Sequence, residues 1–331
     1  MDEVKKPFRV LALDGGGIRG AFSAAVLAQM QEALDRAHPG KRLVDQFDLI
    51  CGTSTGGLLA IALGLGIPSA ELPEMYVEYG DEIFEQPESA FGRISQIWRQ
   101  VTGAKHDPVG LVNVLGEKFG DRVFGESSVR LAITAFDVTL GRIFVFKTAH
   151  DPRFMYDIDV PATQIARCTS AAPTYFPPEV LKAHRDATYV DGGVWANNPS
   201  MVGLIEAVAF CGADIGDVHV LNIGTTSAVE DFSNFDDVTW KLKLPSLLMT
   251  GPSEAAHRQT MLLLGDRFHR IDAKVPQGWA SLDDTEHVEK LATAGRASAV
   301  LKRHVGPVMK LFLTGEDAPK FVPLYTPTPR A

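Results

Sequence analysis

Short apolar runs alternate with longer amphipathic segments through the first part of the chain. The runs at 8–13 and 47–51 have the length and composition of buried strands, and each leads into a glycine-rich stretch. Small apolar residues recur at helical spacing from about 21 to 37, and a second, buried helix starts with 57–63. This order of strand, loop, helix, strand and helix favours an α/β fold with a parallel sheet.

The same patterns predict further elements beyond residue 69. A mixed polar and apolar segment at 69–120 is expected to be helical, and either to cover the sheet or to form a cap over a site. Asn198 and Pro199 have the character of a helix N-cap and first helical residue. The other expected elements are strands at 129–136, 142–146, 188–190 and 218–223, and helices at 166–172, 200–210, 253–264 and 285–303.

The sequence contains no internal repeat and no low-complexity linker. Its length allows one large α/β domain or two smaller ones. After about residue 226 the pattern becomes less regular. We therefore expect a single domain over residues 1–331, with a catalytic core at about 8–225 and a helical C-terminal extension at about 226–331.

Composition and charge narrow the class of protein. The chain has 331 residues, of which 45% are hydrophobic and 22% charged, and its net charge of −9 argues against a general nucleic-acid-binding surface. No stretch approaches the roughly 18 apolar residues of a membrane span, and the beginning of the sequence lacks a secretory apolar region. The cysteines Cys51, Cys168 and Cys211 lie far apart, as reduced thiols would, so a cytoplasmic protein is expected.

A serine follows the second predicted strand in the pattern of a nucleophile. Gly52-Thr53-Ser54-Thr55-Gly56 matches the G-x-S-x-G elbow, in which a serine occupies a sharp turn between strand and helix. Gly52 and Gly56 suit this elbow because the backbone passes too close to the serine for a Cβ. The N-terminus of the following helix also favours a developing negative charge. The alternative is a plain structural turn, since glycine and serine are common in turns.

The first predicted strand leads into the glycine-rich loop 14–20. Consecutive glycines let backbone N–H groups converge on one point, which suits the oxyanion of acyl transfer. A methyl group added at Gly16 is expected to project into that oxyanion pocket. The alternative is a nucleotide-phosphate loop, because the residues from Gly15 also match the weak G-x-G-x-x-G pattern. The second strand, however, ends in the serine motif instead of the acidic residue of a dinucleotide-binding fold.

Asp191-Gly192-Gly193 supplies a candidate base at the end of a predicted strand, where α/β sheets place their sites, although Asp-Gly is by itself a turn signal. A Ser-Asp-His arrangement would require a histidine after Asp191. The histidines that follow it, none of them in a glycine-marked loop at a strand end, are His219, His257, His269, His287 and His304. Without a histidine, Asp191 would take the serine proton directly, and burial would help by raising its pKa. The HExxH, CxxC and EF-hand spacings are absent, so neither a metal nor another cofactor is expected.

Three blocks together resemble the signature blocks of the patatin-like phospholipases, in the order of that family. These blocks are 14–20, 52–56 and 191–193, and the stretches 169–176 and 197–199 also fit. The similarity covers about residues 8–225, and the C-terminal hundred residues match less clearly. The resemblance implies a three-layer α/β/α fold with a central, mostly parallel sheet.

The resemblance also implies a lipid acyl hydrolase of the phospholipase A type that acts on membrane phospholipids through a Ser-Asp dyad. Carried over by position, the nucleophile is Ser54, the base is Asp191, and the oxyanion loop comprises Gly15, Gly16, Gly17 and Arg19, with Arg19 steadying the loop. No cofactor is implied. Two other functions remain open from the residues alone, namely a Ser-His-Asp esterase on soluble esters and a nucleotide-binding regulatory module.

Patatin-like enzymes include bacterial effector lipases of anti-phage defence, which cyclic dinucleotides switch on. If this chain is one of them, we expect it to be cytoplasmic, to reach the inner membrane as a peripheral protein when active, and to self-associate. The expected cap carries apolar side chains for a bilayer at Phe84, Phe91, Ile97 and Trp98. A local basic group could meet the phosphates of an activator, or it could be ordinary solvated surface, and it consists of Arg258, Arg267, His269 and Arg270.

Overall fold

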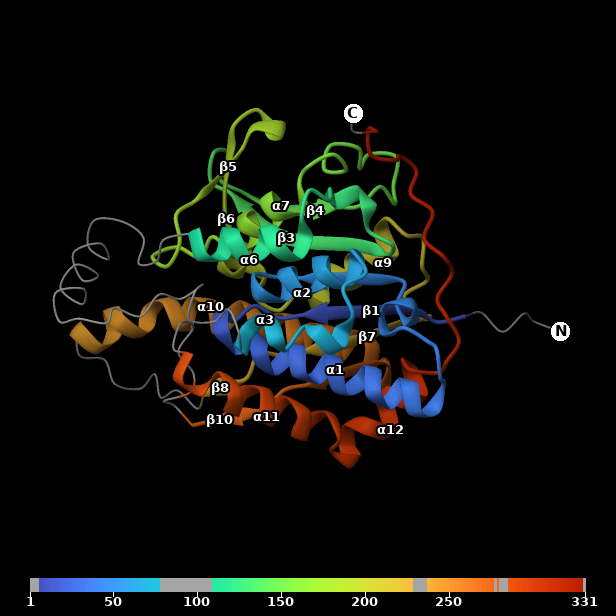
Figure 1. The fold of residues 1–331 in the computed structure, drawn as a ribbon. Helices are drawn as coiled ribbons and strands as arrows, with labels where there is room; N and C mark the ends of the chain where they lie inside the picture. Colours follow the sequence, from blue (N-terminus) through green and yellow to red (C-terminus); the bar gives the residue numbers. More distant parts are fainter. Residues whose placement is uncertain (1–5, 78–108, 229–236, 277–278, 280–284, 330–331) are drawn as a thin grey trace.

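A mixed eight-stranded sheet organises the described part of the chain (Figure 1). The computed structural model describes residues 6–77, 109–228, 237–276, 279 and 285–329. Most of the expected cap, with its four apolar side chains, lies outside the described residues.

Five strands of the sheet run parallel and lie side by side. In spatial order they are β3 (Arg130–Asp137), β2 (Leu49–Gly52), β1 (Phe8–Leu13), β7 (Val218–Ile223) and β9 (Phe268–Ile271). Three strands extend the sheet in antiparallel pairing, namely β4 (Arg142–Lys147), β6 (Ala187–Asp191) and β5 (Glu179–Leu181). A separate pair of short strands is formed by β8 (Ser227–Ala228) and β10 (Lys274–Val275).

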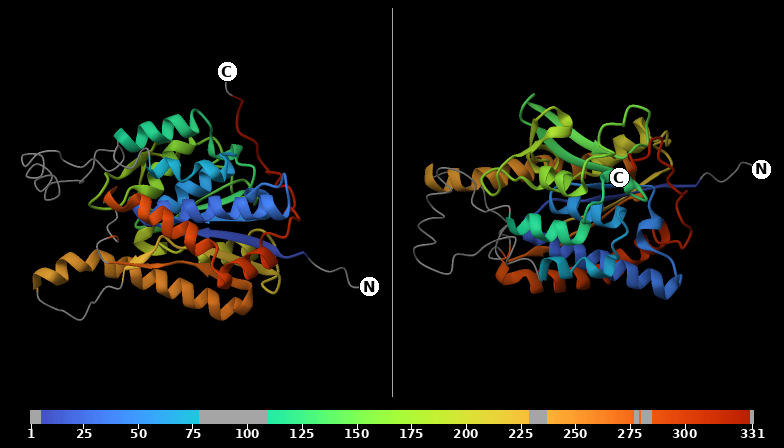
Figure 2. Two further views of the ribbon diagram at one scale, coloured as in Figure 1. Left: turned by 60° about the horizontal axis from the view of Figure 1, so that its bottom comes forward. Right: turned by 45° about the horizontal axis from the view of Figure 1, so that its top comes forward.

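Helices cover both faces of the sheet, which gives the expected three layers. One face packs against α1 (Gly20–Ala37), α2 (Thr55–Gly64) and α7 (Ala162–Ser170), and the opposite face against α9 (Ser200–Ala209) and α10 (Asp237–Leu264). The other helices are α3 (Glu74–Val77), α6 (Val109–Phe119), α8 (Gly193–Ala196), α11 (Val288–Ala299) and α12 (Lys302–Leu311). Helix α11 lies alongside α1, as the left view of Figure 2 shows.

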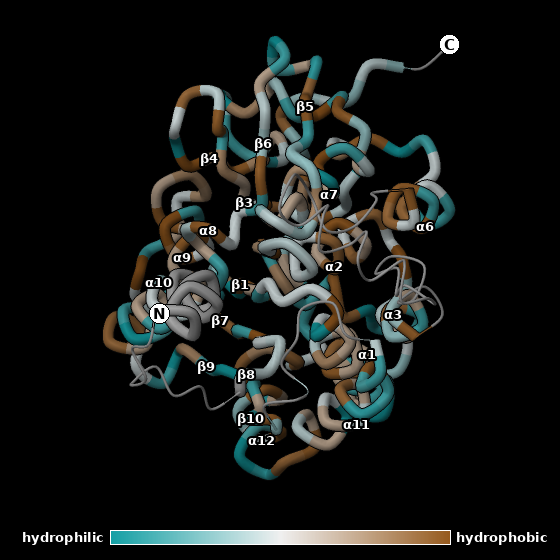
Figure 3. The backbone as a smooth tube through the Cα atoms, turned by 90° about the vertical axis from the view of Figure 1, so that its left-hand side faces the viewer, coloured by the Kyte–Doolittle hydropathy of each residue, from teal (hydrophilic) through white to brown (hydrophobic). Residues whose placement is uncertain are grey.

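The burial of β1 explains why its sequence from Val10 to Leu13 is a continuous apolar run. Leu11 and Leu13 belong to the core on the α1 face, whereas Val10 and Ala12 belong to the core on the α9 face. A strand that is covered on both faces therefore lacks the alternation of polar and apolar residues that a half-exposed strand has. Hydrophilic segments lie mainly at the periphery of the molecule (Figure 3).

The boundaries of the predicted elements differ from the observed ones where local pattern is weak. The expected helix 253–264 is the last part of the longer helix α10, and β9 was not predicted at all. The segment after residue 226 is therefore not only helical, because β9 pairs with β7 as a strand of the main sheet. The N-cap at Asn198 is present, since its Oδ1 accepts hydrogen bonds from the backbone N–H of Ser200 at 2.9 Å and from its hydroxyl at 2.6 Å.

Candidate active site

Ser54 occupies a strained turn between β2 and α2. Its φ of 54° and ψ of −126° lie outside the regions that a residue with a side chain normally adopts. The flanking glycines make the turn possible, because a Cβ at Gly56 would collide with the backbone carbonyl of Leu13 and one at Gly52 with the carbonyl of Gly56. The serine is therefore held in the geometry of the expected elbow.

Strand pairing brings the ends of β2 and β6 together. At its C-terminal end Gly52 of β2 pairs with Ile133 of β3, and Asp191 of β6 pairs with Ala135 of the same strand. Strand β4 pairs with β3 at both Ile133 and Ala135, so it occupies one edge of β3, and β2 and β6 share the other edge. Because β2 runs parallel to β3 and β6 runs antiparallel to it, the C-terminal ends of β2 and β6 face each other along this edge. Thr134 of β3 lies between their two pairing positions. The sequence predicted the strand end, but not this reversal of direction.

Asp191 is a buried carboxylate that faces the serine. Its exposure is 4%, and its Oδ1 accepts a hydrogen bond from the backbone N–H of Gly193 at 2.6 Å. Burial raises the pKa of Asp191 to about 6, although the Ser54 hydroxyl and the Gly193 N–H both lower it. A base with this pKa is still ionised at neutral pH and accepts a proton more readily than an exposed aspartate.

A chain of threonine hydroxyls ties the serine turn to its surroundings. The backbone N–H of Ser54 donates to Oγ1 of Thr169 at 2.9 Å, and that hydroxyl donates to the carbonyl of Thr134 at 2.7 Å. The Thr134 hydroxyl donates to the Thr53 hydroxyl at 2.7 Å, which in turn donates to the carbonyl of Ala196 at 2.6 Å. These bonds connect β2, β3, α7 and α8. The sequence did not predict these hydrogen bonds, because they join segments that lie far apart in the chain.

The glycine loop places two of its three glycines in the pocket of Ser54. Gly16 and Gly17 line this pocket together with Ser54 and Asp191. Within the described residues, the N–H groups of Gly16 and Gly17 donate to no protein acceptor. Gly15 differs, because its N–H donates to the carbonyl of Asn197 at 2.9 Å. The expectation that Gly15 offers an oxyanion donor is therefore wrong.

Contacts on the side of the loop away from Ser54 fix its orientation. The Thr225 hydroxyl donates to the carbonyl of Gly15 at 2.7 Å. Arg19 donates from Nε to the carbonyl of Gly16 at 3.3 Å and from a terminal nitrogen to that of Thr226 at 3.2 Å, so it steadies the loop as expected. A Cβ at Gly16 would collide with the Thr225 side chain, so the expected methyl group in the oxyanion pocket is a wrong prediction.

The remaining wall of the pocket is apolar. Its side chains come from five different segments and include Leu58, Tyr76, Leu111, Tyr175, Phe176 and Met249. The Tyr76 hydroxyl is buried against the hydroxyl of Thr55, the first residue of α2. The pocket holds about 600 Å³ of empty space, part of it open to solvent. Such a wall suits a hydrocarbon chain beside the serine.

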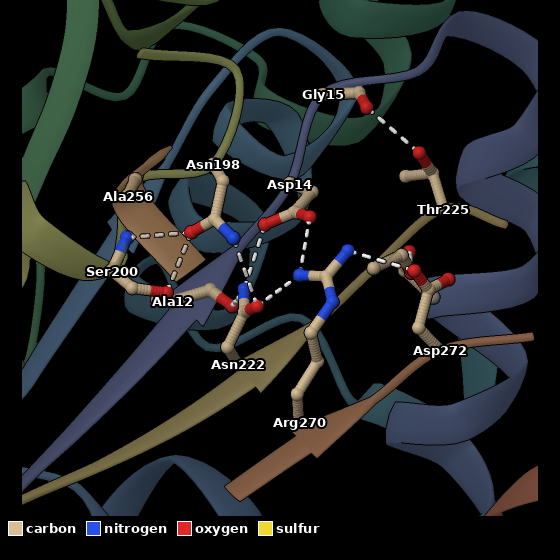
Figure 4. A network of polar contacts seen from close by, with 12 residues as sticks. Ala12, Asp14, Gly15, Asn198, Ser200, Asn222, Thr225, Ala256, Arg270 and Asp272 are labelled. Carbon is tan, nitrogen blue, oxygen red and sulfur yellow. Dashed lines mark hydrogen bonds and ion pairs between the residues drawn. The ribbon is translucent and has the colours of Figure 1, made fainter. Parts of the chain in front are cut away.

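A charged network lies behind the glycine loop (Figure 4). Asp14, the residue before the glycines, accepts hydrogen bonds from Arg270 and from Asn222, both at 2.7 Å. Arg270 also bonds Asp272 at 2.8 Å, and it contacts the side-chain oxygen of Asn222. Burial raises the pKa of Asp14 to about 6, whereas Arg270 and Asn222 act in the opposite direction.

Each member of the predicted basic group has a partner within the protein. Arg270 is committed to Asp14 and Asp272, and the His269 ring bonds that of His304 at 3.0 Å. Arg258 pairs with Glu254 at 2.5 Å. Arg267 donates to backbone carbonyls. These contacts favour the interpretation of this group as ordinary packing and surface, and Arg258 remains largely exposed.

Other chemistry finds little support in the described residues. No histidine among them lines the Ser54 pocket, and His219 instead contacts Phe312 edge to face. No group of three or more potential metal-binding side chains occurs in the part of the chain that the structure describes. Likewise, no helix within the described ranges has the length and hydrophobicity needed to span a bilayer. Cys51 and Cys168 are buried thiols, as expected, whereas Cys211 is only partly buried.

Comparisons with known proteins agree with the motifs. A family model described as patatin-like phospholipase matches residues 11–203. A cGAMP-activated phospholipase of Pseudomonas aeruginosa (strain BWHPSA011 / Pa011) is 34% identical over 290 residues, which make up 86% of this chain and 82% of that protein. A cGAMP-activated phospholipase of Escherichia coli (strain TW11681) is 36% identical over 237 residues, covering 70% of this chain and 65% of that protein. Human GIVD cytosolic phospholipase A2 aligns with a TM-score of 0.43 and 12% identity, over 95% of this chain and 61% of that one.

Proposed function

The chain belongs to the patatin-like phospholipase family and is a hydrolase, and on that premise we propose that Ser54 and Asp191 hydrolyse the acyl esters of membrane phospholipids. The observation that carries this proposal is the pairing of a strained, pocket-facing serine with a buried carboxylate whose pKa is raised to about 6. The pocket beside them is lined by apolar side chains, as a fatty acyl chain requires.

In the proposed reaction Asp191 accepts the proton of the Ser54 hydroxyl as its Oγ attacks the ester carbonyl. The negative charge that forms on the carbonyl oxygen is met by the N–H groups of Gly16 and Gly17, supported by the N-terminus of α2. Asp191 then gives its proton to the departing alcohol of the lysophospholipid. Water, deprotonated by Asp191, then attacks the acyl-Ser54 ester, and Asp191 returns that proton to the Ser54 Oγ as the fatty acid is released.

Fatty acid release from phospholipid vesicles tests these roles. Ser54→Ala should abolish hydrolysis, and Asp191→Asn should lower it by about 10²–10⁴-fold, because an amide cannot accept the proton. Asp48→Asn is a matched control, since Asp48 is also a buried carboxylate with a raised pKa but precedes β2, at the end remote from Ser54. Normal turnover in Asp191→Asn, together with its loss in a histidine variant, would favour a Ser-His-Asp esterase. Failure of a fluorophosphonate to label Ser54 would favour a non-enzymatic, nucleotide-binding role.

The two cGAMP-activated relatives support a second proposal, that a cyclic dinucleotide switches on this chain. The resting protein would be nearly silent, and the activator would turn it against the inner membrane as a peripheral, cytoplasmic enzyme, with self-association as part of the switch. Lipid release is measured against a panel of cyclic dinucleotides and trinucleotides, with particle size followed by light scattering. Full activity without a nucleotide, unchanged by the whole panel, would contradict the proposal. We do not assign the activator's binding site to the predicted basic group, because Arg270 already pairs with Asp14 and Asp272.

A further inference from the structure

We propose that Arg270, on strand β9, is a positioning residue for the oxyanion loop of this enzyme. The inference rests on the proposed function of Ser54 and Asp191. Arg270 lies outside residues 11–203, the part of the chain that matches the family model. The oxyanion site would then depend on the C-terminal third of the chain, which no signature block covers.

Three neighbouring strands bring the partners of this network together at the carboxyl edge of the sheet. Asp14 directly follows β1, and the last residue of β1 pairs with Ile223 of β7. Next to it, Asn222 of β7 pairs with Arg270 of β9. Parallel pairing thus aligns Asp14, Asn222 and Arg270 across the carboxyl edge of the sheet, and Asp272 anchors the far side of the guanidinium at 2.8 Å.

The burial of Asp14 makes the position of the loop sensitive to Arg270. Asp14 is 2% exposed, so its charge has little contact with water and depends on Arg270 and Asn222. Removing one partner of a buried ion pair leaves an uncompensated charge, which must be protonated or must move toward solvent. Any movement of Asp14 is passed on to the glycines that follow it in the chain.

Gly16 and Gly17 line the pocket, and within the described residues their N–H groups donate to no protein acceptor. Thr225 holds the Gly15 carbonyl, and Asp272 in turn accepts the backbone N–H of Thr226 at 3.0 Å. Asp272 therefore connects Arg270 to the segment that clamps the loop. Arg270 touches neither Ser54 nor the pocket lining, so its effect on catalysis must pass through the loop.

Arg270→Gln is expected to lower kcat by roughly 10²-fold, because a displacement of about 1 Å in a catalytic group has that effect. KM should change by less than about twofold, since the apolar wall that binds the acyl chain is untouched. Arg270→Lys keeps a cation beside Asp14 but loses the fork that also reaches Asp272, so it should restore kcat in part. Arg267→Gln is the matched control, because Arg267 precedes β9 and, within the described ranges, its hydrogen bonds go to the backbone carbonyls of Ile215 and Val218.

The double variant Asp14→Asn/Arg270→Gln separates positioning from general stability. It removes the buried charge of Asp14 together with its cation, so its unfolding midpoint should recover toward the wild type while kcat stays low. Recovery of kcat together with stability would overturn the proposal, as would a normal kcat in Arg270→Gln. If Arg270→Gln does not fold, Thr225→Val tests the positioning of the loop instead. It removes the hydroxyl that donates to the Gly15 carbonyl. An unchanged kcat in Thr225→Val would also overturn the proposal.

All variants are compared on the full chain, with phospholipid vesicles and under conditions in which the wild type is active. Ser54→Ala is included to distinguish a failure of the proposed function from a failure of the proposed role of Arg270. If Ser54→Ala still hydrolyses phospholipid, the proposed function itself fails. If Ser54→Ala is inactive and Arg270→Gln is normal, only the role of Arg270 fails.

Discussion

Asp191→Asn is expected to lower hydrolysis by about 10²–10⁴-fold and at the same time to stabilise the protein at alkaline pH. Asp191 is 4% exposed, and burial raises its pKa from 3.8 to about 6. Asparagine has nearly the same shape, keeps an oxygen that can accept the Gly193 N–H, and carries no charge to bury. The variant therefore removes an electrostatic cost that the wild type tolerates for catalysis.

The magnitude follows from the two pKa values. A raised pKa means that the folded state holds the proton more tightly than the unfolded state, so ionisation of Asp191 destabilises the fold. This cost is absent in acid, develops as the pH rises from about 4 to about 6, and is complete above that range. At about 1.4 kcal/mol per pH unit, the difference between 3.8 and about 6 corresponds to about 3 kcal/mol at pH 8.

Urea unfolding of the wild type and Asp191→Asn at two pH values measures this cost. The variant should be more stable by about 3 kcal/mol near pH 8 and by only about 1 kcal/mol near pH 4.5. Ser54→Ala provides the control, because it is also inactive but keeps the buried carboxylate, and it should show no comparable gain. An Asp191→Asn protein less stable than the wild type near pH 8 would refute the reasoning, since Asp191 would then act as a structural turn residue.

The other predictions concern pH dependence, packing and metals. The value of kcat/KM should rise with pH around a midpoint of about 6, because Asp191 must be ionised to act as base, and a flat profile from pH 5 to 8 would contradict this. Thermal melting should show a large loss of stability for Gly56→Ala, whose Cβ would meet backbone, whereas Gly116→Ala, in open space on α6, should be neutral or better by up to about 1 kcal/mol. Thr169→Val should destabilise the fold by about 1–3 kcal/mol in urea unfolding because it leaves the Ser54 N–H without its acceptor, whereas Thr169→Ser should not. Hydrolysis should persist in EDTA, because the proposed oxyanion donors are backbone N–H groups, and recovery by added Ca²⁺ after chelation would speak against that.

The sequence predicted the parts of the fold whose signals are local. Buried apolar runs followed by glycine located β1 and β2, and the α/β class and the family assignment are confirmed. The residues of the dyad stay a prediction, although Ser54 and Asp191 do line one pocket. Gly15 shows the limit of such motifs, because which glycine N–H is free depends on where the carbonyl of Asn197 lies.

The features that the sequence did not reveal depend on contacts between distant segments. Strand β9 is only four residues long and partly polar, so its pattern does not distinguish it from a loop. Arg270 looked like a surface cation because its partner Asp14 is 256 positions away. The direction of β6 could not be read either, because strand periodicity is the same for parallel and antiparallel pairing.

The position of Arg270 in the chain has a consequence for how the protein is made. A ribosome completes Ser54 and Asp191 before Arg270, and Arg270 follows Asp14 by 256 residues. At a synthesis rate of about 5–20 residues per second, roughly 13–50 seconds separate the emergence of the glycine loop from that of its clamp. If Arg270 positions the oxyanion loop as proposed, the nascent chain during this interval has Ser54 without a positioned oxyanion site. The order of synthesis would then delay full lipase activity until translation is nearly complete.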